Sequence, residues 1–215
     1  MKNKKTFITI LTFCIVVFLV VGVVFAALTM NTEYKRNVFT FGEVTIDLTE
    51  PEWDDNEPEE KLVYPNRSVD KDPQVTNTGT TNIYAYIEVQ VPRAEVRTVT
   101  GDKTVNPKAW IDLFTYTINS TDWVLIDSNV SSDNLYTVNV YAYKKELLAP
   151  GATTSPLFTE VTFANILEGD ITSGTNLTIP VNAYAIQSGY LNESGSTIAE
   201  KMTDAFEIYK RVKGA

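Results

Sequence analysis

Apolar and polar residues alternate with a period of two in several parts of this chain, and this pattern constrains its fold more than any other feature. The clearest case is residues 83–91, where every second residue is apolar. Successive side chains of a β-strand point to opposite faces, so the pattern predicts a strand with one buried face, ended by Pro92. Further strands are expected at residues 38–50, 114–118, 123–126, 135–143, 157–163 and 176–186.

The residues between these strands favour turns. Asn77-Thr78-Gly79 is the clearest turn signal, and Pro150-Gly151 is another. Gly42-Glu43 shifts the phase of alternation inside residues 38–50, which predicts a β-bulge there. Residues 110–114 are expected to form a short helical turn. Seven to nine strands joined by turns, with no alternating helices, predict a mainly β protein with a β-sandwich architecture.

Two tyrosines fall on the polar face of the strand at residues 83–91. Tyr84 and Tyr86 alternate with its apolar residues, so we expect them to be exposed. Aromatic side chains on the outer face of a sheet usually pack across neighbouring strands. That packing is the favoured interpretation, and an aromatic binding platform is the alternative.

The last segment of the chain has a helical pattern instead. Thr197 and Glu200 have the spacing of a capping box, in which each side chain bonds the other's backbone N–H. Acidic residues lie early in the segment and basic residues late, as the helix dipole favours. The sequence therefore predicts a short C-terminal helix. Its apolar residues recur with helical spacing: Ile198, Met202, Ala205, Tyr209 and Val212.

The start of the chain has the features of a signal peptide. Three lysines precede an apolar run at residues 7–28, and Val24 and Ala26 occupy the positions that signal peptidase reads before a cut at Ala27. We therefore expect residues 1–26 to be removed on export. The alternative is an uncleaved leader that anchors the protein, because an apolar run of this length can span a bilayer.

Charge and cysteine content narrow the class of protein. Without the three lysines of the leader, the chain has 15 basic and 27 acidic residues and a formal charge of −12. Such a surface repels nucleic acid, so a nucleic-acid partner is not expected. The single cysteine, Cys14, lies in the leader, and the exported part can form no internal disulfide. Together these features favour a bacterial surface of Gram-positive type.

The sequence gives no support for a cofactor or for most enzyme mechanisms. The chain has no histidine, which excludes a His-Glu-x-x-His zinc site and every histidine-based catalytic triad. No glycine-rich loop opens a helix, so nucleotide binding has no support. A carboxylate pair at glycosidase spacing stays open as an alternative. Residues 50–60 hold seven acids, for which we expect a solvated loop, with a cation site as the alternative.

Four stretches resemble the TasA/camelysin family of exported proteins. They are residues 37–50, residues 64–79 together with 83–91, residues 148–158 and residues 181–187. The resemblance covers most of the chain after the leader. It implies a jelly-roll-like domain and processing by a SipW-type signal peptidase. Family members form biofilm-matrix fibres in which an N-terminal arm adds a strand to the next subunit. Part of the family is described as metalloprotease, and the lack of histidine argues against that activity here.

The resemblance and the leader together divide the chain into three parts. Residues 1–26 are the expected signal peptide, residues 27–37 an N-terminal arm that acts as donor strand, and residues 38–215 the jelly-roll-like domain. In the arm, Leu28 and Met30 are two residues apart and share one face of a strand. Tyr34 is the third arm residue expected to contribute. The arm could also fold back on its own sheet or stay disordered.

The function expected from these features is a secreted structural subunit of extracellular biofilm-matrix fibres, without enzymatic activity. Its expected partners are further copies of itself and the signal peptidase, with other matrix or cell-wall components as further candidates. Its expected location is the extracellular matrix or the cell surface. The alternative is a monomeric adhesion or binding module held at the surface by an uncleaved leader.

Overall fold

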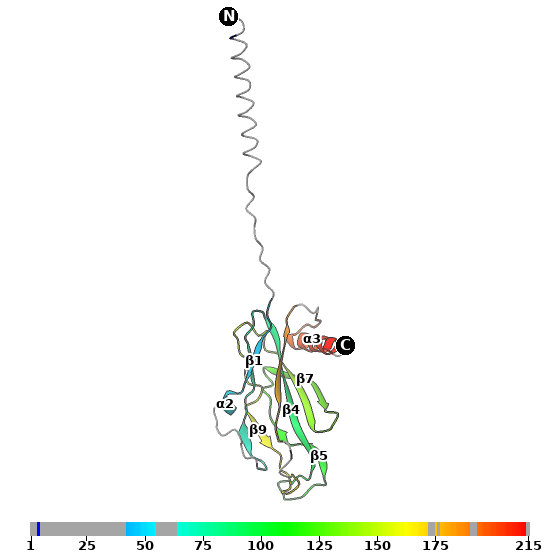
Figure 1. Cartoon of the computed structure of the whole chain (residues 1–215). Helices are drawn as coiled ribbons and strands as arrows, with labels where there is room; N and C mark the ends of the chain where they lie inside the picture. The colour runs from blue at the N-terminus through cyan, green and yellow to red at the C-terminus, as the bar shows by residue number, and fades with distance from the viewer. Residues whose placement is uncertain are drawn as a thin grey trace. The chain divides into compact units, whose positions relative to one another are not determined.

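The computed structural model describes Lys4 and residues 42–54, 64–171, 175, 177–189 and 193–213. The unit from Gly42 to Ala215 is mainly β, and its described strands form antiparallel sheets stacked as a sandwich, followed by a C-terminal helix (Figure 1). The predicted fold class is therefore confirmed. The leader, the arm and residues 38–41 lie outside the described residues.

The largest sheet forms one layer. Its strand order is β10-β4-β8-β7, and the short β5 pairs with the far end of β4. Every strand pair in this sheet is antiparallel. Its strands are β4 (Ile83–Val96), β5 (Ala109–Asp112), β7 (Trp123–Val130), β8 (Tyr136–Tyr143) and β10 (Val181–Gln187).

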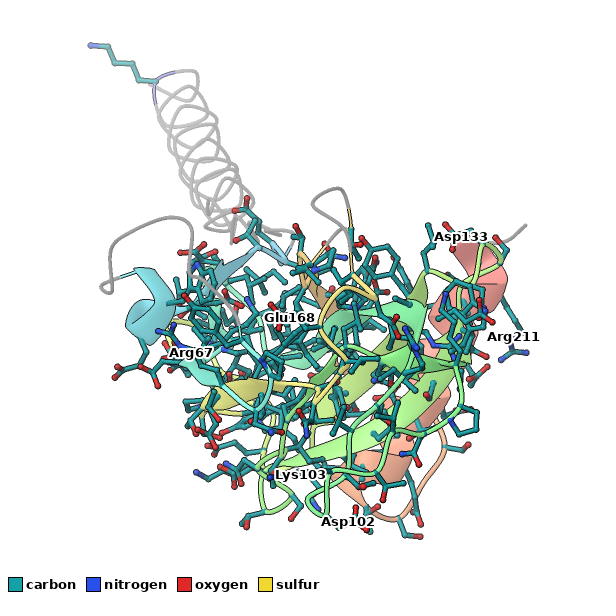
Figure 2. All side chains as sticks on the ribbon, turned by 90° about the horizontal axis from the view of Figure 1, so that it is seen from below. Arg67, Asp102, Lys103, Asp133, Glu168 and Arg211 are labelled. Carbon is teal, nitrogen blue, oxygen red and sulfur yellow. The ribbon has the colours of Figure 1, made fainter. Side chains whose placement is uncertain are left out.

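Two smaller sheets lie on one face of the large sheet, and the helix α3 lies on the other (Figures 1 and 2). One small sheet pairs β1 with β3, and the other has the order β2-β9-β6. The short helix α2 follows β1. The bounds are β1 (Ile46–Thr49), α2 (Pro51–Asp54), β2 (Ser68–Asp70), β3 (Gln74–Asn77), β6 (Phe114–Thr115), β9 (Glu160–Phe163) and α3 (Ile198–Lys213).

Strand β4 is buried on both faces. Its inward side chains, every second residue from Ile83 to Val91, are at most 1% exposed. Tyr84 and Tyr86 point to the other face but are also buried, so the expectation that they would be exposed is wrong. The helix α3 covers them: the Tyr86 hydroxyl donates to the Met202 carbonyl oxygen at 2.8 Å. The Tyr86 ring packs against the Phe206 ring, with centroids 5.5 Å apart. Periodicity within one strand cannot show which distant element covers its polar face.

The prediction that Pro92 ends this strand is also wrong, because β4 continues to Val96. The Gln90 N–H donates to the Pro180 carbonyl oxygen at 2.9 Å, so even-numbered residues of β4 direct their backbone groups toward β10. Leu113, which follows β5, lies opposite Pro92 on this side: its N–H donates to the Pro92 carbonyl oxygen at 2.8 Å, and its own carbonyl oxygen accepts from the Ala164 N–H at 2.9 Å instead of from residue 92. A proline at this position removes no ladder hydrogen bond.

Three other local predictions need correction. Residues 110–114 form parts of β5 and β6 rather than a helical turn, because they pair with β4 and β9. Within the described part of residues 38–50, only Ile46–Thr49 is a strand. The turn-rich segment 66–82 contains β2 and β3, which the analysis of alternation did not predict.

The Asn77-Thr78-Gly79 turn connects three segments. The Asn77 side chain is buried and donates to the carbonyl oxygens of Thr81 and Leu148, each at 2.8 Å. Its Oδ1 accepts the Gly79 N–H at 3.0 Å. A Cβ at Gly79 would lie 2.3 Å from the Glu43 carbonyl oxygen, so only glycine lets the backbone before β1 approach this closely.

The capping box predicted for α3 is present. The Glu200 N–H donates to Thr197 Oγ1 at 3.2 Å, and the Thr197 N–H donates to Glu200 Oε2 at 3.1 Å. These two bonds satisfy backbone donors that the first turn of a helix leaves unpaired. The hydrogen bonds to the backbone N–H groups of Ser196 and Thr197 hold the pKa of the Glu200 carboxyl below its ordinary value.

Gly79→Ala should destabilise the protein, because the new methyl group overlaps backbone atoms that cannot move alone. We expect a loss of about 1–3 kcal/mol in the free energy of unfolding, measured by urea denaturation. Gly101→Ala is the matched control, since a Cβ there meets nothing within 4 Å. Equal effects of the two substitutions would contradict this account of the turn.

Candidate functional site

The residues predicted from the sequence to act in export and assembly lie outside the described residues. These are Val24, Ala26 and Ala27 at the expected cleavage site and Leu28, Met30 and Tyr34 in the arm. Among the described residues, no helix is long and apolar enough to cross a membrane, and the apolar run at 7–28 is not among them.

The described domain nevertheless shows the surroundings of its first residue, Gly42. A Cβ placed on Gly42 would lie 3.2 Å from the Gln187 side-chain nitrogen and 3.3 Å from the Thr81 Cβ. Gln187 ends β10, and Thr81 shortly precedes β4. Gly42, the first residue of the described domain, therefore lies beside the end of β10.

The outer edge of β10 has backbone groups without a partner among the described residues. Because the Gln90–Pro180 hydrogen bond fixes the phase of the ladder, the N–H and C=O groups of Val181, Ala183 and Ala185 point away from β4. Their side chains face the interior of the sandwich but are only half-buried. No described residue pairs with these backbone groups.

Strand β1 has the same arrangement. The Thr78 N–H donates to the Thr45 carbonyl oxygen at 3.0 Å, so the backbone groups of Ile46 and Leu48 point away from β3. Both side chains face the core and are half-buried, whereas Val75, opposite Leu48, is fully buried. Strands β1 and β10 lie close together, yet no backbone hydrogen bond between described residues joins them. On these two neighbouring edges, backbone groups that no described residue pairs with thus coincide with half-buried core side chains.

The opposite edge of the large sheet is less suited to pairing. Strand β7 has an irregular register between Leu125 and Asp127, as a β-bulge produces. Asp127 accepts from Lys210 of α3 at 3.1 Å, so a charged pair lies beside the irregularity. Bulges and charges are devices that protect edge strands from adding a further strand. Strands β1 and β10 pair with β3 and β4 in a continuous register over the described residues.

A buried ion pair follows β1. Lys71 Nζ lies 2.6 Å from Glu50 Oε2, with side chains only 9% and 15% exposed, and the ammonium group lies over the Trp53 ring. Asp72 accepts from the Glu52 N–H at 2.9 Å. The prediction of a solvated acidic loop is therefore wrong at Glu50, which Lys71 neutralises.

The rest of the acidic segment, residues 55–60, lies outside the described residues. Among the residues that the structure describes, no group of three or more acidic or cysteine side chains could hold a metal ion.

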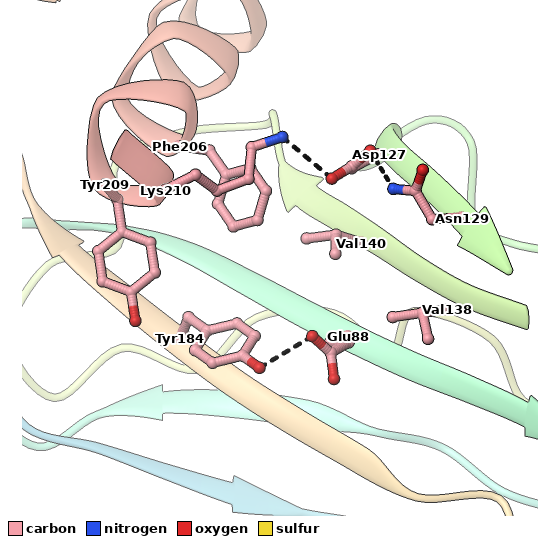
Figure 3. Close-up of a pocket in the computed structure, with 9 residues that line it drawn as sticks. All are labelled: Glu88, Asp127, Asn129, Val138, Val140, Tyr184, Phe206, Tyr209 and Lys210. Carbon is pink, nitrogen blue, oxygen red and sulfur yellow. Dashed lines mark hydrogen bonds and ion pairs between the residues drawn. The ribbon is translucent and has the colours of Figure 1, made fainter. Parts of the chain in front are cut away.

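A polar hollow of about 380 Å³ lies between α3 and the outer face of the large sheet, with Val138 and Val140 among its lining residues (Figure 3). Its charged groups are already paired. Tyr184 donates to Glu88 Oε2 at 2.9 Å, and Lys210 bridges to Asp127. These bonds fix the side chains around the helix, and they give the hollow a structural role.

Burial and neighbouring carboxylates raise the pKa values of tyrosines under α3. Burial, followed by the hydrogen bond to Glu193, raises the pKa of Tyr84 to about 12. Burial and the bond to Glu88 raise the pKa of Tyr184 as well. Both phenols are neutral hydrogen-bond donors at neutral pH: Tyr84 joins the sheet to Glu193 in the segment before α3, and Tyr184 joins β10 to Glu88 of β4.

No family model matches this chain, and no curated protein or solved structure matches it. The candidate site is therefore defined by the geometry of the edges. Sequence reasoning placed residues 38–50 and 181–187 in strands, but it did not identify Ile46, Leu48, Ala183 and Ala185 as edge residues. It also missed the burial of Lys71, because the partner Glu50 is separated from it by 21 positions.

Lys71→Met should destabilise the protein by about 3–5 kcal/mol, because it leaves the Glu50 carboxylate buried without its counter-charge. The double variant Lys71→Met/Glu50→Leu should recover most of this loss, since it removes both charges. Urea denaturation of the two single variants and the double variant measures the coupling. Additive losses would show that the two side chains do not interact.

The raised pKa of Tyr84 predicts a loss of stability in alkali. The ordinary tyrosine pKa is near 10, so the contribution of the neutral phenol is fully present below about pH 10 and is lost as the pH rises toward 12. Tyr84→Phe should therefore lower stability at pH 8 and flatten its decline between pH 10 and 12. The measurement is urea unfolding across this range, and an unchanged slope in the variant would refute the assignment.

Proposed function

We propose that this chain is a secreted structural subunit of extracellular biofilm-matrix fibres, in which the N-terminal arm of one copy adds a β-strand to the next. The observation that carries the proposal is the pair of edges on β1 and β10. There, backbone groups without a partner among the described residues coincide with half-buried core side chains. The resemblance to the TasA/camelysin family supports the same function.

A donated strand would satisfy both deficits at once. Its backbone would pair with the N–H and C=O groups of Ala183 and Ala185, and its apolar side chains would cover the half-buried core residues. Leu28 and Met30 fit this role, because they share one face of a strand. Full burial of each contributes about 1.5–3 kcal/mol, so backbone pairing and residues such as Tyr34 must supply the rest of the affinity.

The path of the chain favours a neighbour's arm over the copy's own. The carbonyl oxygens of Glu43 and Thr45 accept from residues 78–80, so the segment before β1 already runs in the direction of β1. A copy's own arm would have to reverse direction before Gly42 to reach the β1 and β10 edges. An arm from another copy needs no such reversal.

The remaining parts of the proposal rest on the leader and the composition. Cleavage between Ala26 and Ala27 by a SipW-type signal peptidase would release the arm, and the partners are further copies, with other matrix or cell-wall components as candidates. The acidic surface disfavours nucleic acid. Without histidine in the chain, we propose a structural role and no enzymatic one.

Removal of the arm should abolish assembly. Protein beginning at Ala27 is expected to form fibres as its concentration rises, and protein beginning at Val38 is expected to remain monomeric, as measured by light scattering and electron microscopy. Fibres from both proteins, or from neither, would contradict the proposal. A concentration-independent monomer beginning at Ala27 would favour the adhesion-module alternative.

Ala183→Pro should block the acceptor edge without unfolding the domain. It removes an N–H that points away from β4, and prolines are tolerated on edge strands. We expect a circular dichroism spectrum like that of the unmodified protein but no fibre elongation. Asn182→Ala is the matched control, because the backbone of Asn182 pairs with β4; it should elongate normally. Normal fibres from Ala183→Pro would exclude this edge as the acceptor.

A further inference from the structure

At the end of the sandwich farthest from Gly42, two exposed apolar side chains flank Arg93, whose own side chain is only 14% exposed and lies 3.2 Å from Asp112. Trp110 of β5 is 41% exposed, and Leu135, before β8, is 47% exposed. Arg93 connects them: its guanidinium lies over the Trp110 ring at 6.0 Å, and its backbone N–H donates to the Leu135 carbonyl oxygen at 2.8 Å. We call Trp110, Arg93 and Leu135 the Trp110 patch.

This patch and the entry of the arm lie at opposite ends of the large sheet. Strand β4 begins near Gly42 and ends beside β5, and Figure 1 shows β5 at the end of the sandwich remote from β1. The 14 residues of β4 span about 46 Å, at ~3.3 Å per residue. Near Gly42, Val44 is another exposed apolar side chain.

The length of the arm restricts how two copies can be placed. The arm (residues 27–37) and residues 38–41, which connect it to Gly42, are together 15 residues long and reach at most about 50 Å when extended. Strand β10 pairs with β4 only up to Val89, so about 23 Å of β4 lies between the start of β10 and the Trp110 patch. The seven residues of β10 span a further length of about 23 Å.

These lengths add to nearly the full reach of the arm. An arm that leaves one copy at Gly42 and enters the next copy from its Trp110 end can cover β10 only if the two copies lie within about 10 Å of each other. Leu28, 14 residues before Gly42, reaches about 46 Å when extended, and Ala185 lies about 36 Å beyond the Trp110 patch, so a wider gap would leave Leu28 and Met30 short of Ala185. In this arrangement the arm runs antiparallel to β10, which is the pairing that sheets with short connections favour.

From this we infer that the Trp110 patch is the docking surface for the Gly42 end of a second copy, so that fibre subunits stack head to tail in direct contact. The inference rests on the proposed function, since it uses the reach of the donated arm. Tryptophan is enriched among the residues that dominate the energetics of protein interfaces, and an exposed Trp110 ring supported by the Arg93 guanidinium is of the type that forms a hot spot. The contact joins two different surfaces, so it repeats as an open filament.

Disulfide trapping tests the contact directly, because protein beginning at Ala27 has no cysteine. Val44→Cys and Leu135→Cys are prepared separately, mixed under conditions that allow fibre growth, and oxidised. We expect cross-linked dimers from this mixture. Val44→Cys mixed with Val212→Cys is the control, since Val212 is 73% exposed but lies on α3, away from the patch. It should give at least tenfold less cross-linked product.

A second variant tests the energetics. Trp110→Ala should slow fibre elongation about tenfold or more, whereas Trp110→Phe should retain most of the rate, because it keeps an aromatic ring under Arg93. Fibres that form without a 44–135 cross-link and are insensitive to Trp110→Ala would overturn the stacking inference but leave strand donation intact. Absence of fibres from the unmodified protein would overturn both.

Discussion

The burial of β4 on both faces is the constraint on which the rest of the structure depends. Its apolar face forms the centre of the sandwich, and its tyrosine face requires a second cover, which α3 provides through Phe206 and the bond from Tyr86 to the Met202 carbonyl oxygen. Strand β4 also pairs with β8 on one side and β10 on the other. The inward side chains of β4 from Ile83 to Val91 therefore need no further cover, whereas those of the edge strand β10 are only half-buried.

The edges differ in how they are protected. On β7, the irregular register and the Asp127–Lys210 pair oppose further pairing. On β1, the surrounding contacts hold the strand in place while its outer edge has no partner among the described residues: the Asn77-Thr78-Gly79 turn fixes its start, and the buried Lys71–Glu50 pair fixes its end. An edge that is rigid and regular loses less conformational entropy when a new strand pairs with it, which makes it a suitable acceptor.

Much of this fold could be predicted from the sequence, because strands such as 83–91 and the helix after Thr197 have strong local patterns. The two residues of the capping box are three positions apart, so its hydrogen bonds could be predicted from the local sequence alone. The errors arose where a distant element decides the outcome. Tyr86 is buried by a helix more than a hundred residues later, and Glu50 is neutralised by Lys71. Pro92 is tolerated because the carbonyl oxygen of Leu113, opposite it, accepts from the Ala164 N–H. The acceptor edge likewise depends on which strands become neighbours, and no local pattern contains that information.

The central claim is that a donated strand pairs with the edge of β10. Amide hydrogen exchange at Ala183 and Ala185 tests it most directly, because their N–H groups point away from β4. The account predicts slow exchange at both amides in fibres of the protein beginning at Ala27. It predicts fast exchange in the protein beginning at Val38, whereas the amides of Asn182 and Tyr184, which pair with β4, stay protected in both. Equal exchange of Ala183 and Ala185 in the two proteins would contradict strand donation at this edge.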